Sequence, residues 1–113
     1  MPTITIDVSD LNRLLGERYT PNELEKPLQN MGVEVEGMTD EGLKIEVFHN
    51  RPDLYSVEGV ARGLKGYLGL ETGLPDYELK EPEISLEVDP ELDGIRPVAV
   101  MGHIKDCQFD ESS

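Results

Sequence analysis

Alternation of apolar and polar positions predicts a strand at the start of the chain and a hairpin further along it. The stretch 3–8 alternates β-branched with polar residues, and the stretches 33–37 and 43–47 alternate in the same way around a five-residue turn at 38–42. A period of two is typical of a strand with one buried face. The pattern therefore predicts one strand followed by an antiparallel hairpin.

Capping residues predict two short helices between these strands. Ser9 is placed to cap a helix that Gly16 ends. The sequence Thr20-Pro21-Asn22-Glu23 combines a capping box with proline at the first helical position, and so predicts the start of a second helix. Pro27 would remove a hydrogen bond inside that helix, so we expect a kink or an early end near residue 26.

The strongest helical signal runs from about Ser56 to Leu68, where apolar residues recur every three or four positions. Alternation at 84–88 and 97–104 predicts two further strands. This order favours an α+β fold, in which a mixed or antiparallel sheet has helices packed on one face. We expect residues 1–82 to form one domain. Residues 83–113 would either complete it or lead, through their strands, into the next.

Composition limits the classes of protein to which the chain can belong. No apolar run approaches the roughly 20 residues of a membrane span, and the N-terminus lacks the pattern of a signal peptide. The single cysteine, Cys107, has no partner for an internal disulfide. These features favour a cytoplasmic protein without a membrane partner.

Acidic residues outnumber basic ones, 24 to 10, which gives a formal net charge of −14. Such a charge disfavours autonomous binding of nucleic acid, because that binding relies on Lys and Arg to neutralise phosphates. The acidic residues are scattered rather than grouped in a tail. They fit a well-solvated surface, with or without a salt-rich cytosol, and an acidic docking face toward a basic partner is the alternative.

Candidate catalytic and metal-binding residues are few. His49 and His103 lie more than fifty residues apart, and the spacings typical of zinc sites, calcium loops and phosphate loops are absent from the sequence. The sequence therefore predicts no catalytic, cofactor-binding or metal-binding residue. A small independent enzyme would have to use the neighbourhood of His49.

The densest group of turn-forming and charged residues directly precedes the strongest predicted helix. Arg51 and Asp53 can pair, and Asn50 can cap. Either Ser56 or Asp53 can accept hydrogen bonds from the free N–H groups of the helix. We interpret the group as a turn held by side-chain hydrogen bonds. The functional alternative is that Arg51 and Tyr55 project into an interface, where both residue types are favoured.

Glycines recur along the same predicted helix at Gly59, Gly63, Gly66 and Gly69. Each glycine within a helix costs about 1 kcal/mol relative to alanine. Close packing of this glycine face against another backbone would explain the cost, and we prefer this explanation to a ligand site.

The residues 50–75, Asn-Arg-Pro-Asp-Leu-Tyr-Ser-Val-Glu-Gly-Val-Ala-Arg-Gly-Leu-Lys-Gly-Tyr-Leu-Gly-Leu-Glu-Thr-Gly-Leu-Pro, closely resemble the N-terminal domain of the phenylalanyl-tRNA synthetase β-subunit family. The first forty residues resemble it too, through Asp-Leu-Asn-Arg-Leu-Leu-Gly and Gly-Val-Glu-Val-Glu. Ile95-Arg96-Pro97-Val98 resembles the start of the segment that opens the family's editing domain. Bacterial members insert an OB-fold into this domain, so the short turn at 38–42 indicates the archaeal and eukaryotic type.

The resemblance implies a parent ligase that attaches phenylalanine to tRNA(Phe) with ATP and Mg²⁺ as an α2β2 heterotetramer. In the family the aminoacylation site lies on α, and the editing pocket and magnesium ligands lie downstream of this sequence. We therefore expect a non-catalytic scaffolding fragment without a cofactor of its own. Its partners would be the rest of the β subunit, the α subunit and, through the parent enzyme, tRNA.

The motif from Asn50 to Glu58 would be a structural hinge of this domain. The domain would pack against neighbouring domains through the helix of Gly59, Gly63 and Gly66 and through the loop of Arg51. A free-standing protein-binding or adaptor module is the alternative. The sequence stops just after a predicted strand that resembles the entrance to another domain, which favours the fragment.

Overall fold

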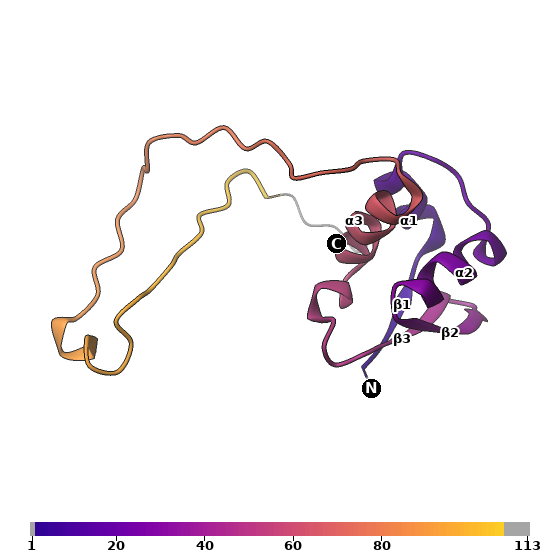
Figure 1. Ribbon diagram of the computed structural model, residues 1–113, viewed down its shortest axis with the longest axis horizontal. Helices are drawn as coiled ribbons and strands as arrows, with labels where there is room; N and C mark the ends of the chain where they lie inside the picture. The colour runs from indigo at the N-terminus through magenta and orange to yellow at the C-terminus, as the bar shows by residue number, and fades with distance from the viewer. Residues whose placement is uncertain (1, 108–113) are drawn as a thin grey trace. The chain divides into compact units, whose positions relative to one another are not determined.

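The computed structural model describes residues 2–107 of the 113-residue chain. They divide into two units, with the boundary between Leu74 and Pro75. The elements follow in the order β1 (Thr3–Ile6), α1 (Val8–Leu15), α2 (Pro21–Asn30), β2 (Val33–Thr39), β3 (Gly42–Val47), η1 (Pro52–Leu54), α3 (Val57–Leu68) and η2 (Pro90–Leu92), where η denotes a 3₁₀ turn (Figure 1). All but η2 belong to the first unit.

The sheet of the first unit is antiparallel, in the order β1-β3-β2. Ile45 at its centre lies opposite Ile4 on one side and Val35 on the other, so β-branched residues form a row across all three strands. The register of β2 shifts between Val35 and Gly37. Because β2 extends to Thr39, where it pairs with Gly42, only two residues separate the strands of the hairpin, fewer than the five we predicted.

One face of the sheet forms the core with the helices. On β3 the buried residues Leu43, Ile45 and Val47 alternate with half-buried ones, as a strand with one covered face requires. The helix α2 packs against β2, and α1 lies beside α3 (Figure 1). The buried apolar side chains are Ile6, Leu11, Leu15, Leu24, Leu28, Val33, Leu43, Ile45, Val47, Leu54, Val60, Ala61 and Leu64. The structure thus confirms the predicted α+β class.

The predicted helices are present, but two of their details were wrong. Asp7, not Ser9, caps α1: its carboxylate accepts hydrogen bonds from the backbone N–H groups of Ser9 and Asp10. The capping box of α2 is confirmed, but this helix does not end near residue 26 and continues through Pro27. Because proline has no N–H, the carbonyl of Glu23, four residues before Pro27, has no partner in the helix. Glu23 is exposed, so water can bind this carbonyl.

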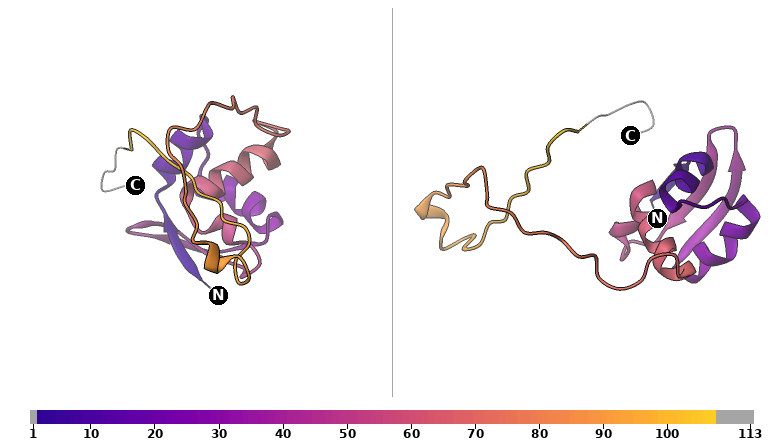
Figure 2. Two further views of the ribbon diagram at one scale, coloured as in Figure 1. Left: turned by 90° about the vertical axis from the view of Figure 1, so that its left-hand side faces the viewer. Right: turned by 90° about the horizontal axis from the view of Figure 1, so that it is seen from above.

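Of the second unit, the described residues contain one short element, η2, and otherwise run as irregular chain (Figure 2). The strands predicted at 84–88 and 97–104 are absent there. A strand needs a ladder of hydrogen bonds to a neighbour, and no described residue in these stretches has such a ladder. Alternation predicts which residues of a strand share a face, but it does not show which segment pairs with that strand.

The packing of α3 onto the core gives a prediction for stability. Leu64 is fully buried, so Leu64→Ala should lower the free energy of unfolding by about 2–4 kcal/mol through lost contacts and a cavity. Arg62→Ala, at an exposed position of the same helix, should change it by less than about 0.5 kcal/mol. Urea denaturation followed by circular dichroism measures both. Equal effects of the two substitutions would contradict this packing.

Candidate functional site

The turn between β3 and α3 contains most of the residues that the sequence singled out. The chain leaves β3 at Val47, passes through η1 and enters α3 after Ser56. Backbone hydrogen bonds from Arg51 N to the Phe48 carbonyl and from Leu54 N to the Arg51 carbonyl, both 3.0 Å, form its two tight bends. Leu54 is fully buried between them and attaches the turn to the core.

The side chain of Arg51 binds two parts of the first unit at once. Its Nε and Nη2 atoms donate to the two carboxylate oxygens of Asp53 at 3.0 and 2.9 Å, a fork that confirms the predicted pair. Its Nη1 atom donates to the backbone carbonyl of Met31 at 2.7 Å. Met31 is the C-terminal cap of α2, so this contact ties the turn to the end of that helix.

The hydrogen bonds between Arg51 and Asp53 stabilise the charged form of both side chains. The hydrogen bonds from Arg51 hold the pKa of the Asp53 carboxyl below its ordinary value, and the same bonds raise the pKa of Arg51. A carboxyl with a lowered pKa stabilises the fold above the pKa of the unfolded chain, and that stability is lost as the pH falls through the lower folded value. The pair therefore loosens only in acid.

Gly59, in the first turn of α3, packs against the backbone of the turn. A Cβ atom at this position would stand 1.8 Å from the carbonyl oxygen of Asp53, so only glycine fits without a shift of the backbone. The N–H of Gly59 donates to Oγ of Ser56 at 3.2 Å, which confirms Ser56 as the cap of α3. The predicted close approach of two backbones is thus present here, inside the first unit.

Gly63 lies one turn further along α3 and faces side chains. A Cβ atom there would meet Cε of Met31 at 2.5 Å and Cδ2 of Leu54 at 3.4 Å. Within the first unit Gly63 therefore approaches side chains from the end of α2 and from the turn, and not another backbone. Gly66 has more room, since the nearest atom to its Cβ position is the Glu71 carbonyl oxygen at 4.0 Å.

Two aromatic residues of the turn remain partly open to solvent. Tyr55 is 38% exposed and Phe48 is 43% exposed, and the hydroxyl of Tyr55 donates to the carbonyl of Phe48 at 3.5 Å. Asn50 and Glu58 are also exposed. The Arg51 side chain instead binds Asp53 and the Met31 carbonyl inside the first unit. Of the two residues proposed for an interface, Tyr55 is therefore the one whose side chain is more available to a partner.

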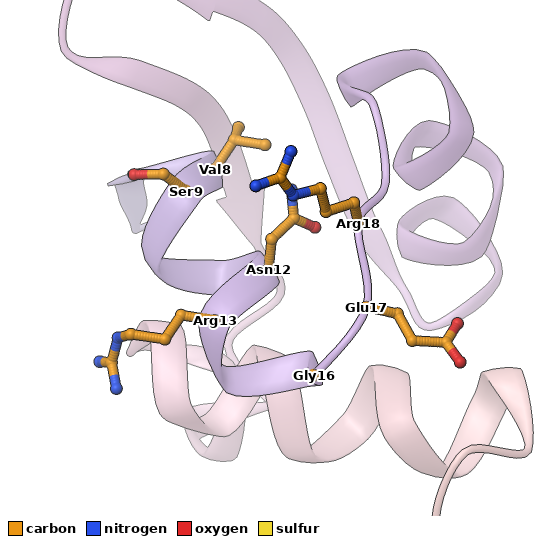
Figure 3. Close-up of a pocket in the computed structure, with 7 residues that line it drawn as sticks. All are labelled: Val8, Ser9, Asn12, Arg13, Gly16, Glu17 and Arg18. Atoms are coloured by element: carbon orange, nitrogen blue, oxygen red, sulfur yellow. The ribbon is translucent and has the colours of Figure 1, made fainter.

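A shallow depression of the first unit lies along α1 and the loop after it (Figure 3). Its lining residues include Asn12, Arg13 and Arg18, and Figure 3 shows Arg13 and Glu17 pointing away from one another. Asn12 is engaged: it accepts from Tyr19 N at 2.9 Å and donates to the Tyr19 carbonyl at 3.0 Å. Arg13 pairs with Asp10 at 2.5 Å. Asn12 and Arg13 are thus engaged within the first unit, and Arg18 also lines the depression.

Two contacts that shape the first unit had no clear signal in the sequence. The Asn12 bridge to Tyr19 spans seven residues, and the bond from Arg51 to the Met31 carbonyl spans twenty. A backbone carbonyl carries no residue type to recognise, so only the fold reveals such partners. Among residues 2–107 no group of three or more His, Cys, Asp or Glu is placed to hold a metal ion. His49, His103 and Cys107 are all exposed.

The role of Arg51 can be tested by replacement. Arg51→Ala should lower the free energy of unfolding by about 1–2 kcal/mol, mostly through the lost bond to the Met31 carbonyl, because water screens the half-exposed pair with Asp53. Arg51→Lys should recover only part of this, since an ammonium group cannot make the fork and the carbonyl bond together. An unchanged melting curve for Arg51→Ala would show that these contacts are not structural.

The glycines of α3 supply a matched pair of substitutions. Gly59→Ala should destabilise the fold by about 1–3 kcal/mol or more, because its methyl group collides with the Asp53 carbonyl. Gly66→Ala has room for the methyl group and should stabilise the fold by up to about 1 kcal/mol through helix propensity. Thermal unfolding of both variants decides the matter. Shifts of the same sign would exclude the close approach at Gly59.

None of the helices in residues 2–107 combines the length and the apolarity that a membrane crossing needs. Residues 1–70 match the family described as the Phe-tRNA synthetase beta subunit B1 domain. The phenylalanine–tRNA ligase beta subunit of Methanosphaera stadtmanae is 42% identical over 112 residues, and that of Pyrococcus horikoshii is 37% identical over 118 residues. These alignments cover 99% and 100% of this chain but 20% and 21% of the relatives.

A solved structure gives the same assignment. The crystal structure of an N-terminal fragment of the phenylalanyl-tRNA synthetase beta subunit from Pyrococcus horikoshii matches with a TM-score of 0.68 and 37% identity, over 86% of this chain and 29% of that one. The chain spans about a fifth of the length of the curated relatives. From its fold, its turn and these matches, the chain belongs to the archaeal-type family of phenylalanyl-tRNA synthetase β-subunit N-terminal B1 domains.

Proposed function

We propose that this chain is a non-catalytic scaffolding domain of a phenylalanyl-tRNA synthetase β subunit. The parent enzyme would attach phenylalanine to tRNA(Phe) with ATP and Mg²⁺ as a cytoplasmic α2β2 heterotetramer. The domain would contact the rest of the β subunit and, through it, the α subunit and tRNA. The observation that carries the proposal is the match of nearly the whole chain to β subunits that are about five times as long.

The chemistry of the first unit supports a scaffold. Its charged groups at the turn bind one another: both carboxylate oxygens of Asp53 accept from Arg51, whose third nitrogen, Nη1, donates to the Met31 carbonyl. A catalytic site needs titratable groups directed at a substrate. Here the strongest polar cluster fixes the path of the chain, and the turn is a hinge between the sheet and α3 rather than a centre of reaction.

The division of the chain is also part of the proposal. We infer that residues 1–82 form the B1 domain together with the connector that leaves it, and that residues 83–113 lead into a following domain. All residues from 71 to 107 are exposed. A segment of this kind fits a junction that other parts of a longer polypeptide would cover.

A free-standing protein-binding or adaptor module is the second candidate. The partly exposed pair of Phe48 and Tyr55 on this turn favours it, because exposed aromatic side chains are typical interface anchors. Such a module would bind a protein partner without any synthetase subunit.

Replacement of the matching part of a relative tests the proposal. We would exchange the N-terminal fifth of the Methanosphaera stadtmanae β subunit for this chain and express the chimera with the α subunit of that organism. The chimera should co-purify with α and form Phe-tRNA, whereas a β subunit that lacks this fifth should do neither. The Gly66→Ala chimera should behave as the unsubstituted one does, and Gly59→Ala should lose assembly.

A folded chimera that behaves as the deletion does would contradict the scaffold role. Binding of the free chain to other proteins would then be the next property to measure, and a specific partner unrelated to the synthetase would establish the adaptor module.

A further inference from the structure

Exposed apolar side chains recur at alternate positions in two stretches of the second unit, 84–88 and 98–104. Gly102 and the odd-numbered Met101 interrupt the second stretch, and the alternating set, each side chain between 45% and 93% exposed, consists of Ile84, Leu86, Val88, Val98, Val100 and Ile104. A soluble chain seldom leaves so many large apolar groups uncovered in one segment unless the segment has a contact to make. All of them have even residue numbers, which places them on one face wherever the chain is extended.

The chain reverses direction between the two apolar stretches. The carboxylate of Asp89 accepts from Glu91 N at 2.9 Å and caps the turn η2, and the N–H groups of Ile95 and Arg96 both donate to the Leu92 carbonyl, at 2.9 and 2.7 Å. The stretches 84–88 and 98–104 therefore form two arms within the second unit. The chain runs toward η2 along the first arm and back from it along the second (Figure 1).

Contacts between the arms indicate how their residues face one another. Far from the turn, the ammonium group of Lys105 pairs with the carboxylate of Glu83. Nearer to it, one open depression is lined by Ile84 together with Met101 and His103, and another is lined by residues 88–90 together with 96, 97 and 99. Both depressions thus take residues from both arms, and the ion pair of Glu83 with Lys105 gives the register.

This register places the apolar residues on the same side of both arms. With Glu83 opposite Lys105, Ile84 faces Ile104 and Val88 faces Val100. The even-numbered residues of both arms then share one face, and Ser85, Glu87, His103 and the ion pair lie on the other. A shift by one residue would mix the two sets, and the ion pair selects a register that keeps them apart.

We propose that residues 83–105 form a two-stranded antiparallel ribbon, in the register of Glu83 with Lys105, whose even-numbered apolar face docks on the polypeptide that follows the matched region in longer β subunits. The inference rests on the proposed function, because it takes its partner from there. An isolated two-stranded ribbon is marginally stable in water. The arms therefore pair only transiently in the free chain, and a covering layer that buries their apolar face stabilises the paired form.

Two observations favour that partner over a second copy of the chain. The relatives match this chain over 99–100% of its length, so the similarity extends through both arms, and they are about five times as long. The match to the solved relative covers 86% of the chain and so extends past Leu74 into the second unit. A second copy would bring together two chains of formal charge −14, which opposes association.

The register can be measured in the free chain. In a Cys107→Ser background, the pair Ser85→Cys with His103→Cys is in register, and Ser85→Cys with Gly102→Cys is displaced by one residue. The two loops have nearly the same length, so their closure entropies match. In a glutathione redox buffer the in-register disulfide should be favoured at least about fivefold. Equal disulfide formation, or a preference for the displaced pair, would overturn the register.

The docking face can be measured in the chimera with the Methanosphaera stadtmanae β subunit. Amide hydrogen exchange of residues 83–105 should be at least about tenfold slower in the chimera than in the free chain. Val100→Asp should abolish this protection, and Met101→Asp, its neighbour on the opposite face, should preserve it. Leu86→Asp should act as Val100→Asp does.

The outcomes separate this inference from the proposed function. A chimera that does not assemble contradicts the proposed function and removes the proposed partner. A chimera that assembles but responds equally to Val100→Asp and Met101→Asp overturns the amphipathic docking face alone. A concentration-dependent dimer of the free chain that Val100→Asp abolishes would assign the face to a second copy and overturn the proposed partner.

Discussion

The fold of the first unit depends on how closely the backbone at the start of α3 approaches the turn that precedes it. Gly59 leaves room for the Asp53 carbonyl oxygen where a Cβ atom would stand at 1.8 Å. This approach lets α3 begin directly after η1 and direct Val60 and Leu64 into the core. Arg51 holds the same turn from the other side, through Asp53 and the Met31 carbonyl at the end of α2. Sheet, α2 and α3 thus meet at one turn.

Local signals predicted much of this arrangement because their partners are close in sequence. The capping box at Thr20, the cap at Ser56 and the pair of Arg51 with Asp53 each join residues two or three positions apart. Apolar and polar residues alternate along the strands that contain Ile4 and Ile45. This alternation likewise predicts a buried face of a sheet, since the pleat repeats every two residues. The closeness of Gly59 to Asp53 had a weaker signal, a glycine where alanine would serve the helix better.

Contacts with backbone atoms and between distant segments could not be predicted in this way. The Met31 carbonyl that binds Arg51 is twenty residues away and has no side-chain signature. The cap of α1 is Asp7 and not the predicted Ser9. Either residue type can accept the capping hydrogen bonds, so the exact first residue of the helix determines which one does. The strands predicted after residue 82 show the same limit: alternation describes a strand's two faces, and pairing depends on a neighbour.

Residues 1–74 then form a self-sufficient domain closed around the turn. Urea unfolding of residues 1–74 beside the full chain tests it most directly. The account predicts one cooperative transition for each, with midpoints that agree within error, because every buried side chain among residues 2–107 lies before residue 75. A midpoint clearly lower for residues 1–74, or a broad transition without cooperativity, would contradict it.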